Sequence, residues 1–468
     1  MVEAAIVPSL RAVTALRPYI EPALRHVGWF ACFLMLAPVV GPRGYGLFIV
    51  ALSGVAIAEA ILVETATGAH ADLSVLEARH LSTALVTTIA AAAGVTLMLQ
   101  GIGRTLGSMV DEAVVDIFQP LSLLPLLGAL TVVPAALLRR DGRRAPGVAS
   151  IAAGLAGGGG VALTLAWAGA GPWSLVAQII VQRFLECAVL WAMTGARVGI
   201  GWSRPHFVEL AGAVDLRALR GAWPTVSRYG PCLIVGTTLG PTAAGLYMLA
   251  SRIAEAVSDT FLARAASLVG DSLSEFARRA CQAIPPAVMG SAVLAIALPS
   301  LVDLRWWGAV LPAQILLLGA LPAALAFVRT GCVDSGATEA RWQTLQMLGG
   351  VAAVAFAAPF GLVAVAAAAL VPAMALAIAS LWPIQRRLGA KSHPLLAAAA
   401  RPCAGAGIGG LLAYVLAGPI GLALDPVPGL CLLIASGWLC CLLIRGEPAV
   451  TVRPTIARRF RLGRANPA

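Results

Sequence analysis

The sequence predicts an all-α membrane protein with about fourteen transmembrane helices, and three observations support this fold class. First, 59% of the 468 residues are hydrophobic and only 12% are charged, about half the charged fraction of an ordinary soluble protein. Second, apolar runs of about 17 to 25 residues recur from end to end, each long enough to cross a bilayer. Third, one short motif occurs twice, which predicts a chain made of two similar halves.

The apolar runs give the expected spans in chain order. In the first half we expect spans near residues 18–39, 44–63, 81–102, 117–138, 148–170 and 173–195. In the second half we expect them near residues 213–238, 243–262, 284–302, 307–328, 344–360 and 362–383. Two more spans follow near 396–420 and 427–444, and the chain ends in a polar, basic tail.

A Gly-Pro motif relates the two halves. Gly41–Ala51 and Gly240–Ala250 share Gly, Pro, Gly, Leu and Ala at equivalent positions. In each copy a Gly-Pro turn should end one span and an apolar helix should follow. Because each half has an even number of spans, a pseudo-two-fold axis along the membrane normal should relate the halves. We expect two six-helix bundles, two additional transmembrane helices and a basic cytoplasmic tail, at residues 1–200, 201–385, 386–444 and 445–468.

The distribution of arginine predicts the orientation of the chain. Arginine is concentrated in alternate loops, such as residues 139–144, and in the C-terminal tail, whereas the opposite set of loops contains little. Cytoplasmic loops carry the excess of basic residues in membrane proteins. Both termini should therefore be cytoplasmic, and both Gly-Pro turns should face outside. Because the basic residues that give the net charge of +11 lie in short loops between spans, nucleic acid is not an expected partner.

Charged residues inside spans are the candidate binding residues, since each is costly in lipid and usually faces a bundle interior. The seventh span is expected to be a kinked helix whose three arginines share a face, and the charged residues of the eighth span share one at spacings of three and four. The second and sixth spans add further charges at depth. The candidate substrate-binding residues are Arg228, Arg252, Arg220, Arg217, Glu255, Asp259, Glu59 and Arg183.

These charges allow two interpretations. Arg183 with Glu186, and Arg252 with Glu255, have the i,i+3 spacing of intrahelical ion pairs that neutralise each other in a buried bundle. Arg228 has no acidic residue within one helical turn, which favours a functional role. An arginine fork suits phosphate or carboxylate, so a pair of mid-depth arginines at positions 228 and 252 would form a site for an anion.

Motifs for covalent chemistry are missing from the sequence. The only lysine, Lys391, lacks the adjacent glycine of a P-loop, and neither HExxH nor GxSxG occurs. The five histidines and nine cysteines show no metal-ligand spacing. We therefore expect no catalytic residues, no metal and no cofactor, and the protein should not be an enzyme.

Four short segments resemble a known family. They are the repeated Gly-Pro turn and the segments Val133–Asp141, Gly171–Ala177 and Trp202–Phe207. Over residues 20–385 the chain resembles the polysaccharide repeat-unit flippases, the oligosaccharide branch of the multidrug and oligosaccharidyl-lipid exporter superfamily. The chain departs from that family at Tyr229–Cys232, where the family often has an aspartate.

The resemblance implies two six-helix bundles around a central cavity lined by the first, second, seventh and eighth spans. It implies flipping of undecaprenyl-pyrophosphate-linked oligosaccharide across the bacterial inner membrane by alternating access, for lipopolysaccharide or exopolysaccharide biosynthesis. The expected partners are that lipid-linked substrate, membrane lipids, and the polymerase and glycosyltransferases of the same pathway. One alternative is a cation-coupled multidrug efflux pump, which would favour acidic, aromatic-rich cavity helices. Another is a membrane polymerase or ligase of the pathway, which would need a long outer loop.

Overall fold

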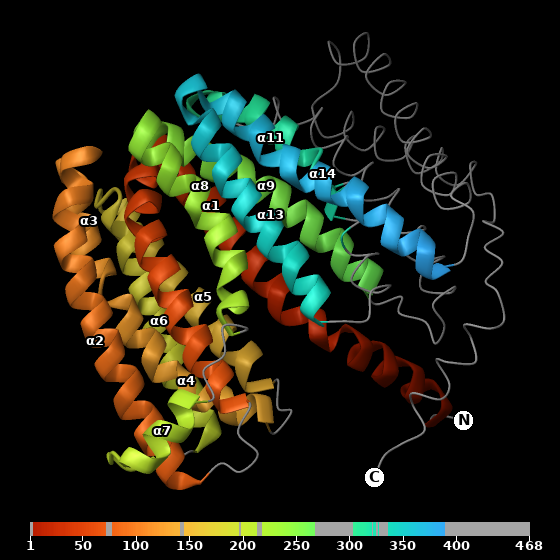
Figure 1. Ribbon diagram of the computed structural model, residues 1–468. Coiled ribbons are helices and arrows are strands. Elements are labelled where there is room, and N and C mark those ends of the chain that lie inside the picture. Colours follow the sequence, from red (N-terminus) through yellow and green to blue (C-terminus); the bar gives the residue numbers. More distant parts are fainter. Residues whose placement is uncertain are drawn as a thin grey trace. The chain divides into compact units, whose positions relative to one another are not determined.

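The structure is a computed structural model, and every regular element that it describes is a helix (Figure 1). It describes residues 3–71, 77–140, 145–195, 198–212, 218–266, 303–320, 322–323, 326 and 336–388. In this part of the chain, seven helical segments are long and apolar enough to cross a membrane. They are Met35–Thr67, Ala78–Thr105, Glu112–Leu138, Pro146–Trp167, Trp173–Thr194, Ala340–Phe360 and Leu362–Ser380. The all-α membrane prediction is therefore confirmed for the described residues.

The expected total of fourteen spans stays a prediction, because the spans near 284–302, 396–420 and 427–444 lie outside the described residues. The helices of the first half are α1 to α6, with bounds Glu3–Ala71, Ala78–Met109, Glu112–Leu121, Leu124–Arg140, Ala145–Trp167 and Trp173–Thr194. The later helices are α7 Arg204–Gly212, α8 Trp223–Leu239, α9 Pro241–Ala266, α11 Val310–Leu317, α13 Gly336–Ala357 and α14 Leu362–Leu388. Short 3-10 helices cover Ala218–Ala222, Leu304–Ala309 and Ala358–Phe360.

The two Gly-Pro motifs have nearly the same backbone conformation. Gly41 interrupts α1 with φ 69° and ψ 171°, and Gly240 separates α8 from α9 with φ 89° and ψ 172°. Only glycine adopts a positive φ of this kind without strain, so each motif needs its first glycine. The turns that the repeat predicts are confirmed at both positions.

The same motifs also contact each other reciprocally. A Cβ atom added to Gly46 would collide with the backbone carbonyl of Pro241, and one added to Gly245 would collide with that of Pro42. Gly46 and Gly245, which stand at equivalent positions of the two motifs, therefore let the helix of each motif meet the proline of the other motif, backbone against backbone. Because they touch, both motifs lie at the same end of the protein, as the repeat predicts.

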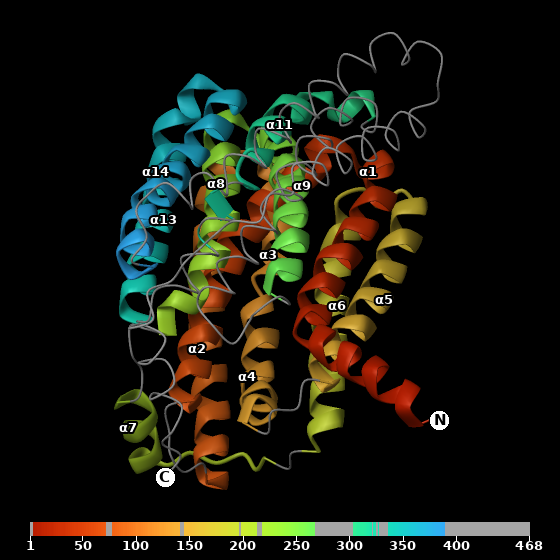
Figure 2. The ribbon, with the colours of Figure 1, turned by 90° about the vertical axis from the view of Figure 1, so that its right-hand side faces the viewer.

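Glycines also bring α5 and α6 together, and the two helices run side by side (Figure 2). A Cβ atom on Gly154 would lie 2.7 Å from Cγ of Glu186, and one on Gly158 would lie 2.7 Å from the carbonyl oxygen of Gln178. Small residues at such positions allow the close helix approach that is common in membrane proteins. This packing carries α6, with its charged residues, against α5.

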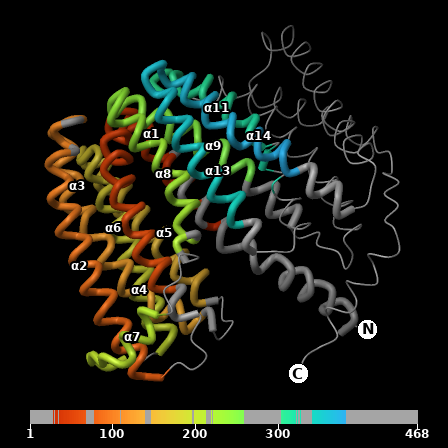
Figure 3. The backbone as a smooth tube through the Cα atoms, in the orientation of Figure 1, coloured from red at the N-terminus to blue at the C-terminus, as the bar shows by residue number. Residues whose placement is uncertain are grey.

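The seventh span, expected to be a kinked helix near residues 213–238, changes from a 3-10 turn to an α-helix close to Pro224. Residues 213–217 lie outside the described part, Ala218–Ala222 form a 3-10 turn, and α8 begins only at Trp223. Pro224 explains this start, since proline fits the first helical turn, where its missing N–H is not needed. Arg220 therefore precedes α8, and the expected face shared by Arg217, Arg220 and Arg228 stays a prediction because Arg217 lies outside the described residues. The short helix α7 comes before this span in the chain, and it packs beside the beginning of α2 (Figure 3).

The chain divides into two compact units. The first contains Met1–Leu249 and Met347–Val365, and the second contains Ala250–Gln346 and Ala366–Ala468. The core of the first unit includes large, fully buried side chains from several helices, such as Tyr45, Phe118 and Leu124. The expected bundle boundaries at residues 200 and 385 stay predictions.

Asp111 caps the N-terminus of α3. Its Oδ1 accepts a hydrogen bond from the Ala113 amide at 3.0 Å, and its Oδ2 accepts one from Arg43 at 2.9 Å. The amide first, and the guanidinium second, hold the pKa of Asp111 below its ordinary value of 3.8. Both partners favour the ionised carboxylate, so the cap should be strongest when Asp111 is charged.

We predict that Asp111→Ala lowers the free energy of unfolding by about 1 kcal/mol, the usual cost of a lost N-cap. Because the folded pKa lies below the unfolded one, this stability is present above about pH 4 and is lost as the pH falls through the folded pKa. Thermal unfolding of the purified protein in detergent at several pH values measures the difference. Glu112→Ala, at the exposed neighbouring position, is the control. A difference that grows as the pH falls would contradict the assignment.

Candidate functional site

An ion-pair triad joins α1 to α6 inside the first unit. Arg183 lies near the middle of α6, and its guanidinium is 3.6 Å from Oε1 of Glu59 on α1 and 3.5 Å from Oε2 of Glu186. The side chain of Glu59 is 8% exposed and that of Glu186 is 6% exposed, whereas the Arg183 side chain is 34% exposed. The intrahelical pair expected from the sequence therefore forms, and Glu59 joins it from another helix.

Neighbouring groups hold the two carboxylates in place. The amide of Gln182 donates a hydrogen bond to Oε1 of Glu186 at 3.0 Å. On α4, a Cβ atom added to Gly128 would lie 2.8 Å from Oε1 of Glu59, so that glycine leaves room for the carboxylate. Gly154 on α5 does the same for Glu186. Four helices thus contribute to the surroundings of the triad.

The triad contains two carboxylates and one guanidinium. Glu59 and Glu186 carry two negative charges when both are ionised, against one positive charge on Arg183. Buried charges are stable only when they are compensated, and Glu186 has a further interaction besides those with Arg183 and Gln182. Among the described residues, the buried Nε of Arg183 has no hydrogen-bond partner, while Tyr229 on α8 lies close enough to interact with the guanidinium electrostatically. The triad therefore connects α1 with α6 and lies near Tyr229 of α8.

Arg228 is the candidate residue of α8, and it also belongs to the first unit. Its side chain is half-buried, and the thiol of Cys232 donates to its carbonyl oxygen at 3.6 Å. The sequence suggested an unpaired arginine, but Arg228 does have interaction partners in the structure. It lies eleven residues before the end of α8 at Leu239, about 16 Å along the helix. Arg217 and the side chain of Arg220 lie outside the described part of the chain.

Arg252 is the candidate residue of α9 and belongs to the second unit. Its side chain is 10% exposed and donates a hydrogen bond to Oε2 of Glu255 at 3.2 Å, which confirms the expected intrahelical pair. Arg252 lies eleven residues after the start of α9 at Pro241, about 16 Å along that helix. The side chain of Asp259 is outside the described part. A binding site that uses both Arg228 and Arg252 remains a proposal.

The sequence did not predict the partnership of Glu59 with Arg183. The two residues are 124 positions apart in the sequence. The only sequence feature that relates them is that both are charged residues, of opposite sign, within predicted spans. It also did not predict a group of histidines and glutamates between α2 and α7, because the members come from two distant segments. Spacing along the chain finds partners on one helix, and both of these contacts join different helices.

Long apolar helices with buried charges, connected by glycine turns, define a multi-pass membrane protein. The fold is similar to the solved structure of the lipid II flippase MurJ in an inward closed conformation, with a TM-score of 0.70 over 92% of this chain and 97% of that chain, at 11% identity. It is also similar to a multidrug resistance MATE family transporter of the MOP superfamily in an inward-facing conformation. That match has a TM-score of 0.57 over 78% of this chain and 94% of that chain, at 14% identity.

The sequence identifies the family. Residues 35–300, more than half of the chain, match the model of the polysaccharide biosynthesis protein family, and the chain belongs to that family. A comparison with curated proteins gives no significant match. The resemblance to polysaccharide exporters is thus confirmed at the level of the family and of the fold, and the two structural neighbours are transporters rather than enzymes.

Proposed function

We propose that this protein flips undecaprenyl-pyrophosphate-linked oligosaccharide repeat units from the cytoplasmic to the outer leaflet of the bacterial inner membrane. The observation that carries the proposal is membership of the polysaccharide biosynthesis family in a chain whose fold is similar to that of a lipid II flippase. The family relates the chain to polysaccharide, and the fold relates it to transport. The charged residues within the spans supply the means to bind an anionic headgroup.

Arg228 and Arg252 are the proposed ligands of that headgroup. Each lies about 16 Å along its helix from the Gly240 turn. A charged side chain at that depth is energetically costly in a membrane, and such residues usually belong to functional sites. A guanidinium presents a planar fork of donors that matches the oxygens of a pyrophosphate. Glu255, 3.2 Å from Arg252, holds that side chain in position until the anion replaces it. Arg217 and Arg220 guide the headgroup from the cytoplasmic side, and Asp259 completes the charged face of α9.

The Arg183 triad is the proposed coupling element. Its two carboxylates, Glu59 and Glu186, face one guanidinium, so a change in the protonation of Glu59 would change the attraction between α1 and α6. Protonation of a carboxylate weakens its attraction to Arg183. The protonation state of the triad can therefore favour one conformation of the surrounding helices over another. Pro231 within α8 and Pro224 at its first turn are the places where that helix can bend.

We predict that Arg228→Ala and Arg252→Ala each weaken binding of the lipid-linked substrate by about 10- to 150-fold, the loss expected for one hydrogen bond to a charged group. Because the bidentate fork is specific to arginine, the Arg→Lys variants should be nearly as defective. Transport is measured with purified protein in liposomes, as transfer of a fluorescent lipid-linked oligosaccharide between leaflets. Complementation of polysaccharide export in a strain that lacks the protein gives the second readout.

Arg104→Ala is the matched control, since Arg104 is an exposed arginine on α2. It should transport like the wild type. If Arg228→Ala and Arg252→Ala also match the wild type, the two arginines are structural and the site assignment is wrong. If liposomes that contain the wild-type protein transport small cationic drugs but not the lipid-linked oligosaccharide, the protein is instead an efflux pump.

A further inference from the structure

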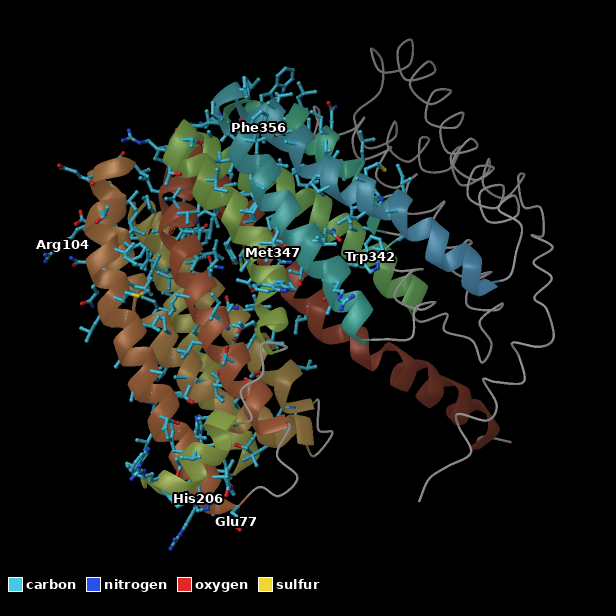
Figure 4. The ribbon with its side chains drawn as sticks, in the orientation of Figure 1. Glu77, Arg104, His206, Trp342, Met347 and Phe356 are labelled. Carbon is cyan, nitrogen blue, oxygen red and sulfur yellow. The ribbon has the colours of Figure 1, made fainter. Side chains whose placement is uncertain are left out.

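Two histidines and two glutamates meet where α7 packs against the beginning of α2, within the first unit. His80 on α2 is buried, and its Nε2 lies 2.8 Å from Oε2 of Glu209 on α7. His206 on α7 has its Nε2 3.6 Å from Oε2 of Glu77, and the two imidazole rings meet edge to face with centroids 4.4 Å apart. Figure 4 shows Glu77 and His206 next to each other at this end of the bundle.

Three of these residues bring potential metal ligands together. One ligand atom from each of Glu77, His80 and His206 lies within 4.8 Å of the other two. Ligand atoms that bind zinc at about 2.0–2.2 Å in a tetrahedron are about 3.4 Å apart, so side-chain movements of about 1 Å would close the set. Two imidazoles and one carboxylate form a recognised ligand set for zinc, with one coordination position left open.

Nδ1 of His206, the ring nitrogen that would not bind the metal, has a hydrogen-bond partner, as is usual for metal-binding histidines. Nδ1 of His206 is 2.7 Å from Oγ of Ser203, which leaves Nε2 directed toward the Glu77 carboxylate. Ser203 is itself held to α2, since its amide donates to Oγ1 of Thr83 at 3.2 Å. An outer hydrogen bond of this kind fixes the ring orientation of a metal-bound histidine.

His80 is held from both sides. Its Nδ1 accepts a hydrogen bond from the Glu77 amide at 3.2 Å, the reverse contact of a capping box at the start of α2, and a metal ion at Nδ1 would replace that hydrogen bond. Its Nε2 faces the Glu209 carboxylate, the kind of outer-shell partner that raises the basicity of a metal-bound imidazole. The cluster therefore offers a carboxylate oxygen of Glu77, Nδ1 of His80 and Nε2 of His206 as ligands once the Glu77 amide releases Nδ1, with outer supports from Ser203 and Glu209.

We propose that Glu77, His80 and His206 bind a divalent transition metal ion, with zinc as the expected ion. Glu77 and His80 belong to the start of α2, whereas His206 belongs to α7, so the ion would fasten the two segments together. α7 is a short helix of nine residues with a single buried hydrophobic side chain, Leu210. Apolar packing alone holds such a helix weakly, and a shared metal ion would fix its position on α2.

The test is a metal titration of the full-length protein, purified in detergent and stripped with a chelator. Zn²⁺ is added in a calorimeter, and Co²⁺ is added as an optical probe of the ligand set and geometry. We expect one ion to bind per chain and to raise the unfolding temperature. His206→Asn and Glu77→Gln should lose that ion and its stabilising effect. Glu209→Gln should weaken binding by about 10- to 100-fold, as loss of an outer partner does.

Glu112→Gln is the control, since it removes an exposed carboxylate at the start of another helix; it should bind metal like the wild type. His206→Asn without metal should unfold at the same temperature as the stripped wild type, which separates loss of binding from loss of folding. Absence of a stoichiometric site in the wild type would overturn the proposal. Equal binding by the wild type, His206→Asn and Glu77→Gln would also overturn it, because the metal would then lie elsewhere.

Discussion

Arg183→Ala should destabilise the protein by about 3–5 kcal/mol, because it leaves two buried carboxylates without their cation. Glu59 and Glu186 are 8% and 6% exposed, so water cannot replace the guanidinium at either carboxylate. Chemical or thermal unfolding in detergent gives the change, and a low yield of folded protein would have the same meaning. A variant as stable as the wild type would show that the ion pairs contribute little.

A neutral version of the same triad separates structure from transport. The triple variant Glu59→Gln, Arg183→Met, Glu186→Gln removes all three charges while preserving most of the volume, and such replacements are often tolerated in protein interiors. We expect it to recover most of the stability lost in Arg183→Ala. If the triad is the coupling element, the triple variant is folded but does not drive transport. Wild-type transport by the triple variant would mean that the charges serve only the fold.

Gly245→Ala and Gly46→Ala should each cost up to about 3 kcal/mol, the upper part of the usual range for overpacking. The obstacle is backbone in both cases: a Cβ atom on Gly245 meets the Pro42 carbonyl, and one on Gly46 meets the Pro241 carbonyl. A side chain can rotate away from a collision, but these carbonyls move only if the helices separate. Transport should fall as well, because that end of the protein could no longer close.

Gly94→Ala is the matched control for this pair. Gly94 lies within α2 and a Cβ atom there meets nothing within 4 Å, so alanine should be neutral or stabilising by up to about 1 kcal/mol. Unfolding in detergent and the liposome assay give both readouts for all three variants. If Gly46→Ala and Gly245→Ala behave like Gly94→Ala, the close contact is not needed for stability or transport.

The sequence predicted the parts of the fold that depend on local order along the chain. Long apolar runs gave the spans that became α2, α5 and α6, because a bilayer-length helix leaves a direct mark on composition. The Gly-Pro repeat gave two equivalent turns, because a positive φ requires glycine. In the seventh span the prolines indicated a kinked helix, but hydropathy did not show that residues 218–222 form a 3-10 turn before α8.

The candidate site was predictable only within single helices. The pairs Arg183–Glu186 and Arg252–Glu255 follow from i,i+3 spacing, and both form. The contact of Glu59 with Arg183 depends on how α1 packs against α6, which no spacing rule encodes. The same limit applies to His80 and His206, which come from segments that only the folded bundle brings together.

The meeting of the two Gly-Pro motifs has the form of a symmetric dimer interface inside one chain. Gly46 receives Pro241 as Gly245 receives Pro42, so each copy of the motif is complementary to the other copy. Interfaces of this isologous kind arise when two identical subunits associate around a two-fold axis. A half-length chain with one such motif could therefore have closed on a second copy of itself. Duplication and fusion of its gene would then have preserved the same contact between the two motifs, and no new interface would have been needed.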